Sequence, residues 1–280
     1  MLEPLQEPFM QRALAEVALI GIAGGALGCW VVFYGLSYAA ESLSHSLFPG
    51  LVLASIAGLP LLFGAAPAIV LAAVAIALAA RVAGVSRDAA VAVVVTTMFG
   101  LGSLLALAPA SPPGIEALLF GDVFGVSDGD LATAAALVIL VAVALRLLHG
   151  RLLVAGFDRG TARSLGVSPG LVDAALLLLL GAAIVVAVQG LGNLLVVAVF
   201  VGPAAAARRL SDRMLPMMLL AAILAVLAGV AGLYLSYYAG TAGGASVALA
   251  IVAIYLLSLP LGRLRAGHRA ASLPSGATIG

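Results

Sequence analysis

Long apolar segments separated by short polar stretches make up most of the chain. The stretches Leu131–Leu145 and Ala174–Ala207 contain no charged residue. Their lengths approach or exceed the roughly 20 residues that cross a bilayer as an α-helix. Only α-helices and closed β-barrels satisfy their backbone hydrogen bonds in lipid, and barrel strands alternate apolar and polar residues, which these stretches do not. The pattern therefore predicts an all-α, polytopic bundle of transmembrane helices.

A window of about 20 residues divides the chain into nine predicted spans. They lie at roughly 15–36, 43–59, 61–80, 89–108, 131–148, 171–189, 192–207, 215–236 and 245–260. Merging the second and third segments gives eight spans as the alternative, but one helix from 43 to 80 is too long for the bilayer. We accordingly divide the chain into an N-terminal segment (1–14), a transmembrane domain (15–262) and a disordered polar tail (263–280).

Small residues recur near one face of the first span. Gly21, Gly25 and Gly28 are spaced by four and three residues. Such spacing allows close backbone contact between membrane helices. Generic apolar filler is the alternative interpretation.

Composition excludes an ordinary soluble domain. Of the 280 residues, 64% are hydrophobic and 9% are charged, against about 45–50% and 25% in soluble domains. The net charge of +1 suggests no nucleic-acid partner. The single cysteine, Cys29, lies in an apolar run, so it forms no intrachain disulfide and is expected to be a small packing residue.

The basic residues are all arginines, since the chain contains no lysine. Twelve of the 13 fall in four clusters: Arg81 and Arg87; Arg146, Arg151, Arg159 and Arg163; Arg208, Arg209 and Arg213; Arg263, Arg265 and Arg269. Two spans fit between successive clusters, so all four clusters can lie on one side, which the positive-inside rule makes cytoplasmic. We therefore predict a multi-pass protein of the inner (plasma) membrane with a cytoplasmic C-terminus and tail.

The opposite side is predicted from acidic residues. The segment 109–130 contains no basic residue and four acidic ones, Glu116, Asp122, Asp128 and Asp130, which agrees with a position outside the cell. The N-terminus lies outside if there are nine spans and inside if there are eight.

The most unusual polar group in the chain is the pair Glu41 and His45 within the stretch 39–50, AAESLSHSLFPG. Residues four apart share one face of a helix, with their Cβ atoms about 5–6 Å apart. Placing an ionisable group in the membrane costs about 2.5–3.5 kcal/mol even on the lenient scale, so such residues usually face a cavity or a partner. A hydrogen-bonded Glu–His pair or an interfacial cap without a transport role is the alternative.

A carboxylate and an imidazole suit Zn, Mn or Fe(II), whereas Cu(I) prefers sulfur. Two ligands are too few for a metal ion, which takes about four to six. A symmetric pair of chains would bring two copies of Glu41 and His45 together around one ion. The pair therefore predicts a metal site shared between two copies.

Motifs of enzymes are weak or missing. Two G-x-S-x-G matches, Gly125–Gly129 and Gly166–Gly170, fall in loops between spans, without the strand–turn–helix setting of a nucleophile elbow. Without lysine there is no G-x-x-x-x-G-K-[ST] loop for ATP. No H-E-x-x-H occurs either. The chain is therefore predicted to be non-catalytic.

Two polar loops are compatible with docking of a cytosolic protein. Phe157–Pro169 is short and basic, and Val199–Pro216 contains Gly202–Pro203 followed by an alanine-rich stretch with arginines. Prolines at both sides predict a separate short helix there. An ordinary basic loop is the alternative.

Three stretches together resemble the integral-membrane subunits of zinc- and manganese-uptake ABC transporters. They are ESLSHSLFPG (41–50), FDRGTARSLGV (157–167) and LLVVAVFVGPAAAARRLS (194–211), and the resemblance extends from Pro8 to about Leu261. It implies a type II ABC importer-like permease with a cytosolic ATP-binding subunit, an extracytoplasmic metal-binding protein and a second permease copy, in a homodimer or heterodimer within membrane lipid. No cofactor is bound permanently; ATP is used on the partner subunit, and Zn²⁺ or Mn²⁺ is transported.

The resemblance also implies roles for residues. Glu41 and His45 would be metal ligands of the channel, although such permeases often have Asp at the first position, so the metal preference stays open. The ATPase-coupling helix would contain Gly202, Pro203, Ala204, Ala205, Ala206, Ala207, Arg208, Arg209 and Asp212. A secondary transporter working alone is the alternative function, but the inverted repeat expected of many such proteins is not convincing here.

Overall fold

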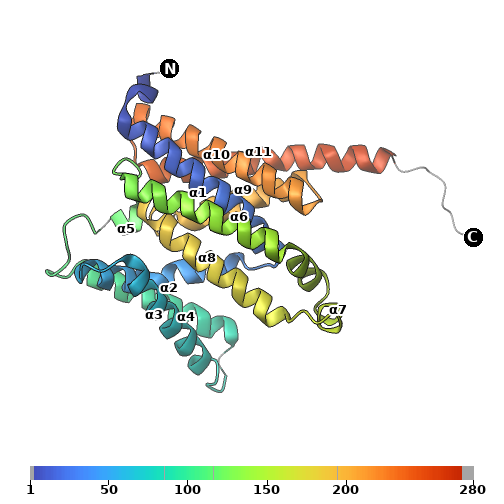
Figure 1. Cartoon of the computed structure of the whole chain (residues 1–280), viewed down its shortest axis with the longest axis horizontal. Helices are drawn as coiled ribbons and strands as arrows, with labels where there is room; N and C mark the ends of the chain where they lie inside the picture. Colours follow the sequence, from blue (N-terminus) through green and yellow to red (C-terminus); the bar gives the residue numbers. More distant parts are fainter. Residues whose placement is uncertain (1–2, 85, 116, 194, 273–280) are drawn as a thin grey trace, which may run out of the picture.

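The chain folds into a bundle of helices, shown in Figure 1. The computed structural model describes residues 3–84, 86–115, 117–193 and 195–272. These ranges contain eleven α-helices, one short 3-10 helix and no strand, which confirms the all-α prediction. In chain order they are η1 (Glu3–Gln6), α1 (Pro8–Phe33), α2 (Ser37–Ile56), α3 (Leu61–Ala79), α4 (Arg87–Ala106), α5 (Ala117–Phe120), α6 (Asp128–Phe157), α7 (Arg159–Ser164), α8 (Pro169–Leu191), α9 (Val196–Leu210), α10 (Met214–Ala239) and α11 (Gly243–Ser272).

Seven helices in the described part of the chain are long and apolar enough to cross a membrane: α1, α3, α4, α6, α8, α10 and α11. The other two predicted spans, 43–59 and 192–207, correspond to α2 and α9. The first half of α2 is polar. The 15 residues of α9 reach about 22 Å, less than the roughly 30 Å of a hydrocarbon core. The predicted count of eight or nine spans is therefore not confirmed.

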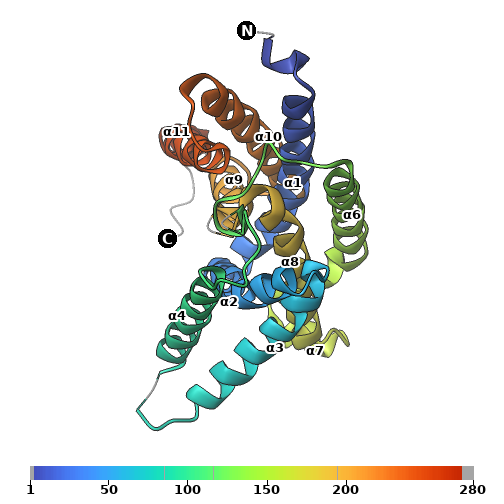
Figure 2. The ribbon, with the colours of Figure 1, turned by 90° about the vertical axis from the view of Figure 1, so that its left-hand side faces the viewer.

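The centre of the bundle is formed by α1 and α8, which have more of their surface buried than the other candidate spans. In Figure 2 they lie between α10, α6 and α2. Glycines bring α1 close to its neighbours, because a Cβ added at Gly25 would lie 2.7 Å from the backbone nitrogen of Ala222 in α10. A Cβ added at Gly28 would overlap the carbonyl oxygen of Phe200 in α9. The predicted close packing through small residues is confirmed.

The prediction of a separate short helix after Pro203 is wrong, because α9 continues without a break from Val196 to Leu210. Proline removes one helical hydrogen bond, but membrane helices tolerate it where neighbouring helices pack on the site. Here Pro203 is buried, and Ala204 and Ala207 pack with Cys29 of α1 and with two side chains of α10. Tertiary packing therefore keeps α9 in one piece.

Two helices pass the predicted domain boundaries. The first, α1, begins at Pro8 rather than at residue 15, and α11 continues to Ser272 rather than ending near 262. Alanine, leucine and arginine favour helices, so these segments stay helical after the apolar pattern ends. Residues 273–280 of the predicted tail lie outside the described residues.

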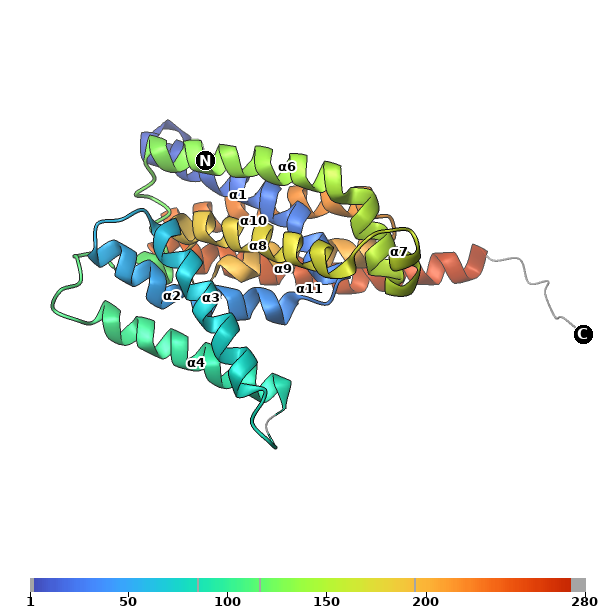
Figure 3. The same ribbon diagram turned by 60° about the horizontal axis from the view of Figure 1, so that its bottom comes forward.

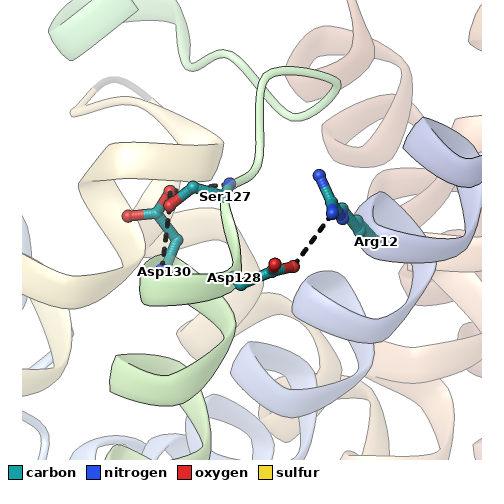
Figure 4. A network of polar contacts seen from close by, with 4 residues as sticks. All are labelled: Arg12, Ser127, Asp128 and Asp130. Atoms are coloured by element: carbon teal, nitrogen blue, oxygen red, sulfur yellow. Dashed lines mark hydrogen bonds and ion pairs between the residues drawn. The ribbon is translucent and has the colours of Figure 1, made fainter.

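The bundle is elongated, and Figures 1 and 3 show which helices reach each end. The side chains at the two ends differ in chemistry. The N-terminus and α5 lie at one end. There, Arg12 of α1 pairs with Asp128 of α6 at 3.1 Å, beside the reciprocal Ser127–Asp130 cap of α6 (Figure 4). The other end holds α7 and the last turns of α6, α9 and α11; we call it the arginine end, after its exposed side chains Arg151, Arg163, Arg208, Arg209 and Arg213.

Candidate functional site

The polar half of α2 places both predicted metal ligands on one helix. Glu41 and His45 are one turn apart in Ser37–Ile56, so they share a face, as predicted. The Glu41 side chain is exposed and His45 is half-buried. A carboxylate is therefore open to the surroundings directly above an imidazole that is partly enclosed.

The imidazole of His45 packs against an aromatic ring. Its ring contacts Phe99 of α4 edge-on, with ring centroids 4.9 Å apart, and Phe99 also contacts Phe48 of α2. The Nδ1 atom of His45 is buried and has no hydrogen-bond partner. Glu41 therefore does not bond this nitrogen, which argues against a simple internal Glu–His pair and leaves a ring nitrogen without a protein partner.

Ser44, between the two candidate ligands, ties α2 to the break between α8 and α9. Its hydroxyl lies 2.9 Å from the backbone oxygen of Asn193 and 2.7 Å from Asn193 Oδ1. Asn193 follows Gly192, whose φ of 76° ends α8; positive φ is readily adopted by glycine. The Asn193 N–H donates to the Leu118 oxygen of α5 at 2.8 Å. The break is therefore bonded to both α2 and α5.

Sequence reasoning did not single out Asn193. The available signal was one amide after glycine within a long uncharged stretch. In the structure, Asn193 is 1% exposed and its Nδ2 has no partner. A second unpartnered group is nearby, since the carboxyl of buried Glu16 in α1 lies against Gly190, where an added Cβ would be 2.7 Å from Oε2. Buried polar groups normally have hydrogen-bond partners, so two unpartnered groups in one region, Asn193 Nδ2 and Glu16 Oε2, are unusual.

One copy of the chain does not assemble a complete metal site in the part that the structure describes. No group of three or more His, Cys, Asp or Glu side chains there could hold an ion. Two donors from α2 fall short of the four to six that a metal takes. The exposed carboxylate of Glu41 leaves room for donors from outside the protomer.

The predicted coupling residues lie in the second half of α9 and just after it. Pro203, Ala204, Ala206 and Ala207 are buried, and Ala205 and Gly202 are partly buried. Arg208, Arg209 and Asp212 are exposed. An Arg208 Nη1–H donates to the Val32 oxygen of α1 at 3.0 Å, and the Arg209 guanidinium lies 5.9 Å from the centre of the Tyr255 ring. The charged residues are therefore the most accessible of this set to another protein.

The other predicted docking stretch, Phe157–Pro169, forms α7 at the same end. Asp158 caps α7: the Thr161 hydroxyl and the backbone N–H groups of Gly160 and Thr161 bond its carboxylate and hold its pKa below the usual 3.8. Arg159 pairs with Asp173 of α8 at 2.9 Å. Cap and ion pair together fix this short helix on the bundle.

Comparison with known proteins identifies relatives along most of the chain. A family model described as "ABC 3 transport family" matches residues 6–262. The manganese transport system membrane protein MntC of Halalkalibacterium halodurans is 32% identical over 221 residues, 78% of this chain and 75% of that protein. The manganese import system permease protein ScaB of Streptococcus gordonii is 30% identical over 250 residues, covering 89% and 90%. A probable iron transport system membrane protein of Haemophilus influenzae is 31% identical over 226 residues, covering 80% and 83%.

Solved structures share the fold. PsaBC from Streptococcus pneumoniae in complex with Fab superposes with a TM-score of 0.87 and 28% identity, covering 92% of this chain and 93% of that one. An inward-facing conformation of a putative metal-chelate type ABC transporter gives a TM-score of 0.66 at 19% identity, covering 90% and 86%. The second likeness concerns the fold alone.

Proposed function

The chain belongs to the ABC 3 transport family and is a membrane permease, and we propose that it carries a divalent transition metal, Mn²⁺ or Zn²⁺, into the cytoplasm. ATP hydrolysis by a separate cytosolic subunit drives the transport. An extracytoplasmic metal-binding protein delivers the ion. The manganese and iron systems named for its relatives support a cargo of this class.

The observation that carries the proposal is the arrangement of Glu41 and His45 on α2. An exposed carboxylate stands one turn from an imidazole whose Nδ1 is buried and unpartnered. Oxygen and imidazole nitrogen are donors that Mn, Fe(II) and Zn accept. The ion takes the place of the missing hydrogen-bond partner during its passage.

A second permease copy completes the site. One chain supplies two donor side chains. Two chains together contribute two carboxylates and two imidazoles, which makes the four donors that a metal site needs. The site binds weakly compared with the delivering protein, because conduction requires release. His45 ligates only when its imidazole is neutral, so the ion competes with protons for this residue.

The ATP-binding subunit docks at the arginine end. Of the predicted coupling residues, Arg208, Arg209 and Asp212 are exposed, whereas most of the alanines are packed inside the bundle. We assign the contact to the charged residues that end α9. The alanines hold α9 against α1 and α10 and do not face the partner.

Uptake of radioactive Mn²⁺ and Zn²⁺ tests the proposed cargo site. Glu41→Gln removes the charge and keeps the shape, and His45→Ala removes a ligand. Both should abolish uptake, normalised to membrane expression, while the protein still inserts and still binds its ATPase. Losses should exceed the roughly 10–100-fold typical of residues that only support a ligand. Glu41→Asp should be milder because the ligand type survives.

The matched control is Glu7→Gln, which removes an exposed carboxylate from the cap of α1 and should leave uptake unchanged. Near-normal uptake by His45→Ala would overturn the coordination role and leave Glu41 and His45 as structural residues. Uptake by the isolated chain under an ion gradient, without ATPase, would instead support the secondary transporter.

A further inference from the structure

A long groove runs between α6 and α10, with α1 as its floor. Both helices pack on α1, and in Figures 1 and 2 they flank it on opposite sides. Two adjoining cavities occupy the groove, with volumes of about 380 and 760 Å³. His149 and Leu215 line both cavities, so the two spaces meet at these residues.

The smaller cavity is an apolar slot at the level of the transmembrane helices. Its floor includes Ala23 and Ala26 of α1, and its walls include Val141 and Ala142 of α6 and Met218 of α10. Alanines on the floor and wall leave space that larger side chains would fill. The slot is therefore shaped for a thin apolar group.

The larger cavity lies at the arginine end and is basic. Arg208 and Arg213 line it, and Arg146 lines the neighbouring end of the slot. Asp212 is the one carboxylate among the described residues that line either cavity. Three guanidinium groups against one carboxylate give this end a net positive charge, and Arg146 and Arg213 are exposed. His149, whose ring contacts Trp30 edge-on at 5.4 Å, separates the basic part from the slot.

An apolar slot that opens into a basic pocket matches an amphiphile with an anionic head. Between Val138 and Phe157 the lining of α6 extends over about 28 Å at 1.5 Å per residue, which is long enough to hold one lipid of a leaflet, about 20–22 Å thick with its headgroup region. Basic pockets between transmembrane helices bind anionic headgroups. A free phosphate would leave the apolar slot empty.

The groove also faces away from the polar half of α2. In Figure 2, α8 lies between α6 and α2, and α8 contacts both helices. The side of the bundle that carries Glu41 is therefore separate from this groove. A second copy that meets the first through α2 leaves the groove open to the membrane.

We propose that the groove between α6 and α10 binds one phospholipid with an anionic headgroup. One acyl chain lies in the slot above Ala23 and Ala26. The phosphate lies at the basic end, where Arg146 and Arg213 bind it and His149 packs at the junction of head and chain. The lipid fills the space between two helices that both pack on α1.

Native mass spectrometry of the full chain in mild detergent tests this assignment. Phosphatidylglycerol, phosphatidylcholine of the same chain length and glycerol phosphate are added in separate titrations. We expect one tightly held phosphatidylglycerol, weaker phosphatidylcholine and no retention of glycerol phosphate. Arg146→Gln and Arg213→Gln should each weaken phosphatidylglycerol about fivefold, the effect of one basic residue near an anionic lipid.

Matched controls separate this groove from general surface binding. Arg151→Gln removes an exposed arginine of α6 outside the groove, and Val143→Phe adds bulk on the lipid-facing side of the same helix. Both should retain the lipid, whereas Ala142→Phe should fill the slot and expel it. Equal retention of both lipids, or unchanged binding in Arg146→Gln, Arg213→Gln and Ala142→Phe, would overturn the proposal. Tight binding of glycerol phosphate would do the same, because it would assign the basic end to a soluble anion.

Discussion

The polar half of α2 and the C-terminal end of α9 are both polar regions on a mostly apolar bundle. They differ in whether their polar groups are buried and whether those groups have partners within the protein. On α2, His45 Nδ1 is buried without a partner, as is Nδ2 of the bonded neighbour Asn193. At the end of α9, Arg208 and Arg209 are exposed, and each also has a contact within the protein. Leaving a buried polar group unpaired costs about 1–3 kcal/mol, whereas an exposed charge carries no such cost.

This difference separates two kinds of function. An unpaired buried nitrogen such as His45 Nδ1 destabilises the folded protein, and this is understandable if a transported ion binds that nitrogen. Exposed guanidinium groups suit contact with water, lipid headgroups or a protein. The buried alanines beside them belong to the packing of the bundle, so a mutation at an alanine and one at an arginine of the same helix should fail in different ways.

The largest effect is expected for Ala206→Asp. Ala206 is 0% exposed, so the new carboxylate would be buried without a partner at a cost on the order of 3–5 kcal/mol. The variant should lose folded, monodisperse protein, measured by size-exclusion chromatography and thermal unfolding in detergent. Its neighbour Ala205 is partly exposed, and Ala205→Asp should fold. A stable Ala206→Asp that lost only its ATPase would contradict the packing of α9.

The next effect concerns the bonds between α2 and the α8–α9 break. Ser44→Ala leaves the Asn193 Oδ1 atom buried without its donor, which should destabilise the protein by about 1–3 kcal/mol. A double-mutant cycle with Asn193→Ala should show coupling of about 0.5–3 kcal/mol in unfolding measurements. Ser42→Ala, two residues earlier on α2, is the control. Simple additivity would mean that the Ser44–Asn193 contact contributes nothing.

A smaller effect is expected for docking. Arg209→Glu reverses a charge at the arginine end, outside the lipid groove, and should lower recovery of co-expressed ATP-binding subunit roughly tenfold, the equivalent of about 1.4 kcal/mol. Membrane insertion should be unchanged. Arg12→Glu, at the opposite end of the bundle, should leave recovery intact. Unchanged recovery with Arg209→Glu would move the docking site to Phe157–Leu165.

The smallest effect concerns the cap of α7. The pKa of Asp158 is held below the usual 3.8 by bonds from Thr161 and Gly160, so the cap stabilises α7 at higher pH. Its contribution is lost as the pH falls below 3.8 through the folded-state pKa. The protection of the Arg159–Ser164 amides, taken relative to their intrinsic exchange rates at each pH, should fall only in that acidic range, and Asp158→Asn should remove the pH step. A step near neutral pH would assign the change to another group.

The placement of Glu41 and His45 was predictable because helix geometry alone puts residues four apart on one face. The same local reasoning placed most of the long apolar helices. It does not extend to contacts between distant segments, such as Ser44 with Asn193, which are 149 residues apart. A single asparagine in an apolar stretch gives no indication of which helix will bond it.

The error at Pro203 has a different origin. Local rules interpret proline as the start of a helix, but the alanines after it pack on Cys29 and on α10. That packing depends on residues far along the chain, so local propensity could not reveal it. The polar start of α1 and the polar end of α11 were missed because a hydropathy window detects the membrane portion of a helix, not the whole helix.

The continuity of α9 has a mechanical consequence. One end adjoins Asn193, which bonds Ser44 beside the proposed cargo site, and the other end carries Arg209, with about 22 Å of unbroken helix between them. A displacement that a partner imposes on the arginine end would be transmitted along α9 to Asn193 and, through its bond with Ser44, to α2. Thermodynamic reciprocity then requires that an ion held at Glu41 and His45 alter the affinity for that partner by the same factor by which the partner alters affinity for the ion.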